Sequence, residues 1–136
     1  MSSSQVLKLM KDKEIEYLDL RFTDPRGKLQ HLTMDATIVD EEMLNDGVFF
    51  DGSSIAGWKA IHESDMILKP DLSRKIIDPF TSHNTLILFC DILDAVKKNS
   101  YERDPRGIAK KAEDYLKKNR HWRQSLFWSR SRIFCI

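Results

Sequence analysis

The sequence contains little cysteine, glycine or proline, and it has no long hydrophobic run. Only two of the 136 residues are cysteines, Cys90 and Cys135, so a disulfide framework is not indicated and the cytoplasm is the expected compartment. The longest apolar stretch, around residues 86–89, is far too short to cross a membrane, and the first residues lack the pattern of a signal peptide. We therefore expect a cytoplasmic protein that does not contact membranes.

The charges and motifs exclude several other classes of function. The 22 basic and 21 acidic residues nearly cancel, which gives no general attraction to nucleic acid. The glycine-rich phosphate-binding patterns GxxxxGK(S/T) and GxGxxG do not occur, so the sequence indicates no nucleotide-binding loop of these types. The four histidines lack metal-ligand spacing, and no His–Cys or His–Ser pattern is visible. We interpret the histidines as solvated or locally bonded, and Cys90 as a small core residue.

The hydrophobic periodicity predicts an α+β fold with a sheet of about four to five strands, an early hairpin and flanking helices. Helices are expected at 4–13, with Ser4 as the N-cap, at 40–45 and from 105 to about 119, with Asp104 as the N-cap. Strands are expected at 15–22, 28–34, 66–71, 76–80 and 85–93, the last of them central and buried. Pro70 is expected to close the strand at 66–71.

One loop, residues 50–59, concentrates the residues that could carry chemistry. Asp51, Ser53 and Ser54 stand beside glycine and could bind a cation through charge and hydrogen bonds. The same residues could instead form an ordinary turn that satisfies its own backbone, and the residues alone favour that interpretation. Trp58 could pack on the domain or anchor another chain, and its local sequence does not separate these two roles.

Several stretches resemble type I glutamine synthetase in the order and spacing of that family. They are Leu18-Asp19-Leu20-Arg21-Phe22-Thr23-Asp24, the run from Phe50 to Met66, Ile77-Asp78-Pro79-Phe80 and Tyr101-Glu102-Arg103-Asp104-Pro105-Arg106. The resemblance covers residues 4 to about 119, and the run from Phe50 to Met66 is long and specific. His62 departs from the asparagine that is usual in the family, and it falls in a loop.

The resemblance implies ATP-dependent ligation of ammonia to glutamate, with Mg or Mn, by two stacked six-membered rings of identical subunits. It implies a β-grasp domain over residues 1–104 and the first helix of a catalytic domain over 105–119. By matching positions, Asp51 and Ser54 would form the ammonium site of the neighbouring subunit, with Asp51 helping to take a proton. The Trp58 loop would cover that site.

The last 17 residues, 120–136, have a different composition and do not resemble the family. They hold four arginines, no acidic residue and two of the three tryptophans. When the reading frame is shifted by one base from codon 120, the permitted codons give Gly-Pro-Glu-Ala-Glu-Phe-Phe, which is the family's metal-binding strand. Both tryptophans then become glycine, and Arg130 and Arg132 fall on the two metal-binding glutamates. We therefore interpret residues 120–136 as an out-of-frame tail without a domain of its own.

The chain is accordingly expected to bind neither ATP nor metal by itself and to be inactive alone. Three alternatives remain open. The tail could be a basic–aromatic arm that binds a membrane or single-stranded nucleic acid. The chain could be a non-catalytic interaction fragment that joins a ring of synthetase subunits, or it could be an unrelated β-grasp binding module. A domain that normally packs on a large catalytic domain would expose apolar surface when separated from it, so we expect the chain to aggregate or to be degraded rapidly.

Overall fold

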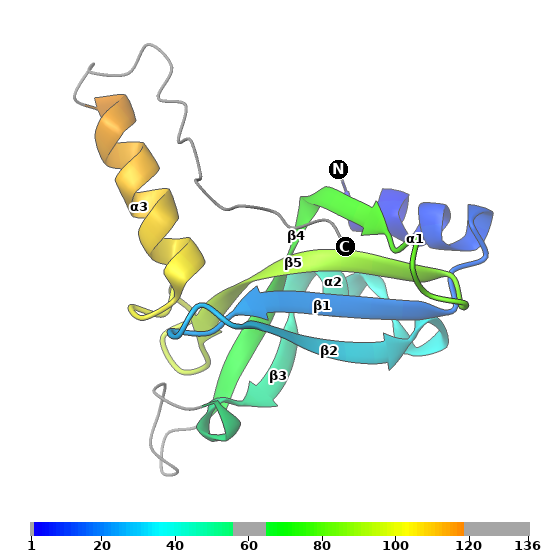
Figure 1. Ribbon diagram of the computed structural model, residues 1–136, viewed down its shortest axis with the longest axis horizontal. Helices are drawn as coiled ribbons and strands as arrows, with labels where there is room; N and C mark the ends of the chain where they lie inside the picture. The colour runs from blue at the N-terminus through cyan, green and yellow to red at the C-terminus, as the bar shows by residue number, and fades with distance from the viewer. Residues whose placement is uncertain (1, 56–64, 119–136) are drawn as a thin grey trace.

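A computed structural model describes residues 2–55 and 65–118 of the chain, which contain one five-stranded sheet and three α-helices (Figure 1). The strands lie in the order β2-β1-β5-β4-β3. Their bounds are β1 Tyr17–Thr23, β2 Leu29–Asp35, β3 Val48–Asp51, β4 Asp65–Ile77 and β5 Thr85–Asp94. The helices are α1 Ser3–Asp12, α2 Glu41–Asp46 and α3 Pro105–Lys118, with short 3-10 turns η1 at Ala36–Ile38 and η2 at Gly52–Ser54. The expected α+β, β-grasp-like sheet with flanking helices is confirmed.

The early hairpin forms as the sequence predicts. Strands β1 and β2 pair antiparallel from Tyr17 opposite Asp35 to Thr23 opposite Leu29. In the turn between them, the Asp24 carboxylate accepts hydrogen bonds of 2.9 Å from the backbone N–H groups of Arg26 and Lys28. The turn sets which residues of β1 and β2 lie opposite each other. A shift of this register by one residue would move the buried side chains of a strand to the outer face of the sheet.

Strand β5 is the centre of the sheet, as expected for the most apolar segment of the chain. It pairs parallel with β1 and antiparallel with β4. Every second residue points into the core, which buries Leu86, Leu88, Cys90 and Ile92. Cys90 is 1% exposed, so its assignment as a core residue is confirmed, and burial raises the pKa of its thiol.

Helix α1 supplies the other side of that core. Its apolar positions, Val6 and Met10, belong to the same buried cluster as Leu18 and Leu20 of β1. The helix is capped by Ser2, whose hydroxyl accepts from the backbone N–H of Gln5 in a capping box. The expectation of Ser4 as N-cap was therefore wrong by two residues, because the Gln that completes the box lies three residues after Ser2.

The two strands expected at 66–71 and 76–80 are one continuous strand, β4. Pro70 does not end it, because the ladder with β5 is shifted between Pro70 and Lys75 by an irregularity of the β-bulge type. A bulge tolerates the missing N–H of proline and lets the strand resume beyond it. Within the irregularity, the Asp71 carboxylate accepts from the Ser73 backbone N–H at 3.0 Å and from its hydroxyl at 2.6 Å.

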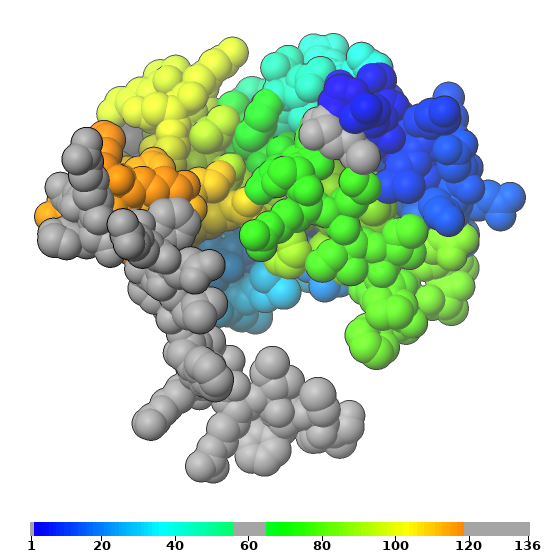
Figure 2. Space-filling model, turned by 90° about the horizontal axis from the view of Figure 1, so that it is seen from above, coloured from blue at the N-terminus to red at the C-terminus, as the bar shows by residue number. Residues whose placement is uncertain are grey.

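Helix α3 lies at the end of the sheet away from α1 (Figures 1 and 2). Its start is as predicted, since the Asp104 carboxylate accepts from the backbone N–H groups of Arg106 at 3.1 Å and Gly107 at 3.0 Å. Its apolar stripe is largely uncovered, however, with Ile108 54% and Tyr115 69% exposed. The proposed boundary between residues 104 and 105 stays a prediction. None of the helices in the described residues has the length and apolar character needed to span a membrane.

Candidate functional site

The Asp51 loop begins where the edge strand β3 ends. Asp51 is the last residue of β3 and the N-cap of η2, and its carboxylate accepts from the backbone N–H of Ser53 at 2.8 Å. The Ser54 hydroxyl donates to the carbonyl oxygen of Asp51 at 2.7 Å. Asp51 and Ser54 are both exposed. The structure therefore brings together the two residues that the sequence singled out, in the turn that the residue types favour.

A second carboxylate stands opposite Asp51 in the sheet. Asp51 pairs with Asp65, the first residue of β4, as the last cross-strand pair of these two strands. The pair therefore places two carboxylate side chains opposite each other at this end of the β3–β4 ladder. Such an arrangement favours a cationic ligand over an anionic one.

Three of the residues predicted from sequence lie outside the described residues. They are Trp58, Arg130 and Arg132. The hypotheses about them stay predictions.

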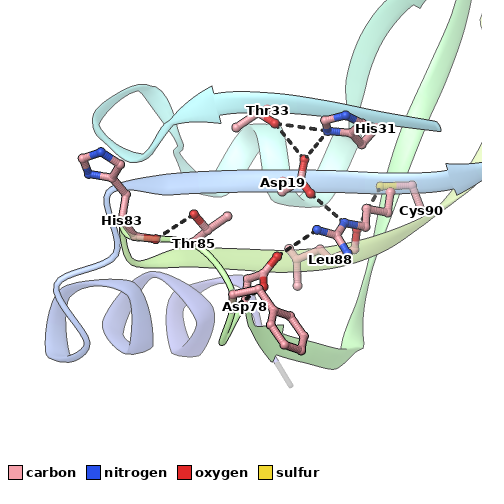
Figure 3. A network of polar contacts seen from close by, with 10 residues as sticks. Asp19, His31, Thr33, Asp78, His83, Thr85, Leu88 and Cys90 are labelled. Carbon is pink, nitrogen blue, oxygen red and sulfur yellow. Dashed lines mark hydrogen bonds and ion pairs between the residues drawn. The ribbon is translucent and has the colours of Figure 1, made fainter. Parts of the chain in front are cut away.

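A polar network that the sequence did not reveal covers the outer face of β1 and β2. Asp19, only 4% exposed, accepts from the Thr33 hydroxyl at 2.8 Å and shares a 2.9 Å hydrogen bond with His31 (Figure 3). Its other oxygen lies 2.6 Å from Arg21 Nε, and Arg21 Nη2 donates to Asp78 at 3.0 Å. The alternation of Leu18, Asp19 and Leu20 shows that Asp19 faces away from the core. The second partner of Arg21, Asp78, lies 57 residues further along the chain, so no local pattern in the sequence indicates it.

Electrostatics keep this network ionised. Burial alone would raise the pKa of Asp19, but hydrogen bonds from Arg21, Thr33 and His31 outweigh that effect and lower it. The hydrogen bond to Asp19 in turn raises the pKa of Arg21 against the opposing effect of burial. One cation therefore joins two carboxylates, which links β1 to the segment after β4.

A groove of about 540 Å³ opens beside this network. Its lining includes Tyr17, Arg21, Asp78, Phe80 and His83. The His83 ring meets Tyr17 edge-on, with 5.7 Å between ring centroids, and its Nδ1 lies 2.9 Å from Glu16. His31 and His83 are thus each bonded to a carboxylate, which confirms the expectation of locally bonded histidines for these two.

The described residues do not form a metal centre. Within residues 2–55 and 65–118, no three His, Cys, Asp or Glu side chains come close enough together to hold a metal ion. The carboxylates that do gather, such as Asp19 with Asp78 and Asp71 with Asp91, share arginine cations instead.

Comparison with known proteins assigns this fold to a family. Residues 14–95 match the family described as "Glutamine synthetase, beta-Grasp domain". The matched range spans all five strands and both Asp51 and Asp78, so the candidate site and the polar network both lie within it.

Individual relatives agree with this assignment. The chain is 60% identical over 116 residues to the glutamine synthetase of Rhizobium meliloti, a match that covers 85% of the chain and 25% of the relative. It is 53% identical over 117 residues to that of Escherichia coli, again with 25% of the relative covered. A solved glutamine synthetase of Plasmodium falciparum, 25% identical, superimposes with a TM-score of 0.78 over 88% of this chain and 23% of that one. The chain thus spans about a quarter of the length of the relatives it matches.

Proposed function

The chain belongs to the glutamine synthetase family, and from this premise we propose that it is the amino-terminal part of a glutamine synthetase that completes the ammonium site of a neighbouring subunit. The parent reaction is the ATP-dependent ligation of ammonia to glutamate, in the cytoplasm, by a ring-shaped assembly of identical subunits. In this role Asp51 attracts the ammonium ion by charge and takes a proton from it. Ser54 holds the loop, and Trp58 covers the site.

The observation that carries this proposal is the position of the Asp51 loop. It lies at the end of an edge strand, exposed, and is held in shape by its own hydrogen bonds to Ser53 and Ser54. A loop shaped in advance loses little entropy when another polypeptide closes over it. The charge of the Asp51–Asp65 pair suits a small cation.

The nucleotide and metal chemistry belongs, in this proposal, to the three quarters of the relatives' length that lie outside the match with this chain. The described residues offer no metal cluster, and we therefore assign them no step in phosphate transfer. The isolated chain is accordingly expected to form no glutamine, and neither ATP nor Mg or Mn is expected to bind it. Purified chain, free of host enzyme, can be assayed for metal-dependent glutamine formation, and measurable activity would refute this part of the proposal.

A chimeric enzyme tests the role of Asp51. Residues 1–118 of this chain would replace the matching part of the Rhizobium meliloti glutamine synthetase, its 60% identical relative. We expect the chimera to form glutamine, and Asp51→Asn to lower kcat by about 10²- to 10⁴-fold, the usual loss for a group that transfers a proton.

The matched control is Asp12→Asn, which makes the same change at an exposed residue at the end of α1, far from the loop. It should leave kcat unchanged while both variants keep the size of the assembly. An Asp51→Asn chimera as active as the parent chimera would remove Asp51 from the mechanism.

For residues 120–136 we propose a shift of reading frame at or just before codon 120. The change of composition and the motif recovered in the shifted frame support it. Sequencing the DNA decides the question, because codons that cannot encode Gly-Pro-Glu-Ala-Glu in the shifted frame would rule it out. If the tail is instead a binding arm, vesicles or oligonucleotides should bind the chain and lose that binding when residues 120–136 are removed.

A further inference from the structure

Phe80 is the most exposed of the large hydrophobic residues in the described part of the chain, with 94% of its surface accessible. It follows β4, whose last two residues, Ile76 and Ile77, are themselves 49% and 41% exposed. Isolated apolar residues on a surface are ordinary, but three within five positions form a patch of the kind that marks an interface.

The segment that carries Phe80 is held by a series of hydrogen bonds and ion pairs. The backbone N–H of Phe80 donates to Asp78 Oδ1 at 3.0 Å, and the other oxygen of Asp78 accepts from Arg21 at 3.0 Å. Arg21 is fixed by the buried Asp19, and the Asp78 backbone N–H donates to Thr85 at 2.9 Å. The polar network of Figure 3 thus ends at the backbone of Phe80.

The other end of the same segment is also anchored. His83 and the backbone N–H of Asn84 both bond to the Glu16 carboxylate, at 2.9 and 3.3 Å, and the Asn84 side chain donates to the carbonyl oxygens of Lys13 and Glu14. The Thr81 hydroxyl donates to the carbonyl of His83 at 2.9 Å. A fully exposed phenylalanine is therefore presented on a segment whose conformation is set in advance.

We propose that Phe80 is a preorganised docking anchor that inserts into an apolar pocket on the remaining three quarters of the glutamine synthetase polypeptide. The inference rests on the proposed function for the identity of its partner. Ordering of loops is one of the costs of association, so an aromatic side chain on a backbone held in shape before binding is suited to be an interface hot spot. The groove beside it, lined by Arg21, Asp78 and His83, would form the polar rim of that interface.

The share of the relatives that the chain covers selects this partner. The chain covers only about 25% of its relatives, so most of a family polypeptide is available to cover the patch. Phe80 also lies beyond the end of β4 opposite to the end that pairs with Asp51. The anchor and the Asp51 loop can therefore contact the rest of the assembly at separate places.

The test compares Phe80→Ser in two settings, the full 136-residue chain and the chimera with the Rhizobium meliloti enzyme. In the isolated chain the unfolding midpoint should stay within about 1 °C, because a side chain that is 94% exposed loses almost no buried area. In the chimera the midpoint should fall by about 4 °C or more, or the assembly should dissociate, as expected for loss of a hot spot.

Val96→Ser is the matched control, because Val96 is 89% exposed on a separate turn. It should change neither protein. If Phe80→Ser lowers the unfolding midpoint equally in both settings, Phe80 has a local structural role and the proposal is wrong. The proposal is also wrong if the midpoint changes in neither setting, or if the variant changes the oligomeric state of the isolated chain. Glutamine formation by the unmutated chimera tests the proposed function separately, because Phe80→Ser is scored by stability and size.

A second variant tests the network that positions the anchor. Asp78→Ala removes the acceptor of the Phe80 N–H and one partner of Arg21. In the chimera, combining Asp78→Ala with Phe80→Ser should cost less than the sum of the two single losses, because a residue that acts through Phe80 has no further effect once the ring is absent. If the two single losses of stability simply add in the double variant, the network does not act through Phe80.

Discussion

Gly47 lies so close to strand β4 that a Cβ atom added to it would stand 2.5 Å from the carbonyl oxygen of Leu68. Its φ of +91° lies in a region that residues with side chains rarely adopt, and its backbone N–H donates to the carbonyl of Met43 at 2.9 Å to end α2. The residue therefore combines the stop of a helix with a tight crossing into β3.

Gly47→Ala should destabilise the chain by about 3 kcal/mol, because backbone strain and overlap with Leu68 add together. Gly27→Ala is the control, since Gly27 also has a positive φ, +82°, but a Cβ there meets nothing within 4 Å. It should cost only about 1 kcal/mol. Urea unfolding of both variants measures the difference, and equal losses would show that strain alone, without overlap, sets the cost at Gly47.

The end of α1 offers a change in the stabilising direction. Glu14 adopts a φ of +49° in a Schellman motif. The Glu14 N–H donates to the carbonyl oxygen of Lys11 at 3.2 Å, and the Ile15 N–H donates to that of Met10 at 2.9 Å. Glu14→Gly should raise the free energy of unfolding by about 0.5–1 kcal/mol, because glycine adopts this conformation without steric cost.

Lys11→Gly provides the comparison for Glu14→Gly, because it makes a similar change at an exposed position inside the same helix. It should lower stability by about 1 kcal/mol. Two changes of the same sign in the thermal or urea midpoint would contradict the assignment of the helix end.

The parts of the fold that the sequence predicted are those set by neighbours in the chain. The turn of the early hairpin, the end of the short helix at 40–45 and the Asp104 cap each depend on residues no more than four apart, so the residue types indicate them. The continuation of β4 past Pro70 depends instead on a bulge against β5, which a proline alone does not announce. The same distinction separates the Asp51 turn, which was found, from the Asp19–Arg21–Asp78 network, which was not.

Asp19 and Asp104 are both buried carboxylates, and their pKa values shift in opposite directions. Hydrogen bonds from Arg21, Thr33 and His31 overcome burial at Asp19 and lower its pKa. At Asp104 burial prevails over three backbone hydrogen bonds and raises the pKa. A carboxylate with a lowered pKa stabilises the fold above its unfolded pKa, near 3.8, and this contribution is lost as the pH falls through the folded value. For a raised pKa, stability instead falls as the pH rises from the unfolded to the folded value.

Asp19→Asn should therefore cost about 3 kcal/mol at pH 7, where it leaves the buried side of Arg21 with one partner fewer. The difference from the unmutated chain should shrink steadily below pH 4, because the protonated Asp19 no longer makes the ion pair. Urea unfolding between pH 3 and pH 7 measures the difference. A cost that is the same at both ends of this range would show that the charge of Asp19 contributes nothing and that only its shape matters.

Arg106 is the residue that fixes α3 to the sheet. Its Nη2 contacts Asp71 in the bulge of β4, and its Nε lies 2.8 Å from Asp91 of β5. Lys110, one turn further along α3, reaches the same Asp91 at 2.6 Å but is half exposed. Because α3 makes few other contacts with the sheet, this cluster holds the helix in place through charge more than through apolar packing.

Arg106→Gln should lower the free energy of unfolding by about 2 kcal/mol, because Asp71 and Asp91 lose a shared, partly buried cation. The effect should concentrate in α3, whose backbone amides should exchange with deuterium faster than those of β5. Lys110→Gln should cost no more than about 0.5 kcal/mol, as is usual for exposed ion pairs. If the backbone amides of α3 exchange at the same rate in both variants, the Asp104 cap and the short connection to β5 set the position of the helix. The ion pairs of Arg106 then do not hold α3 on the sheet.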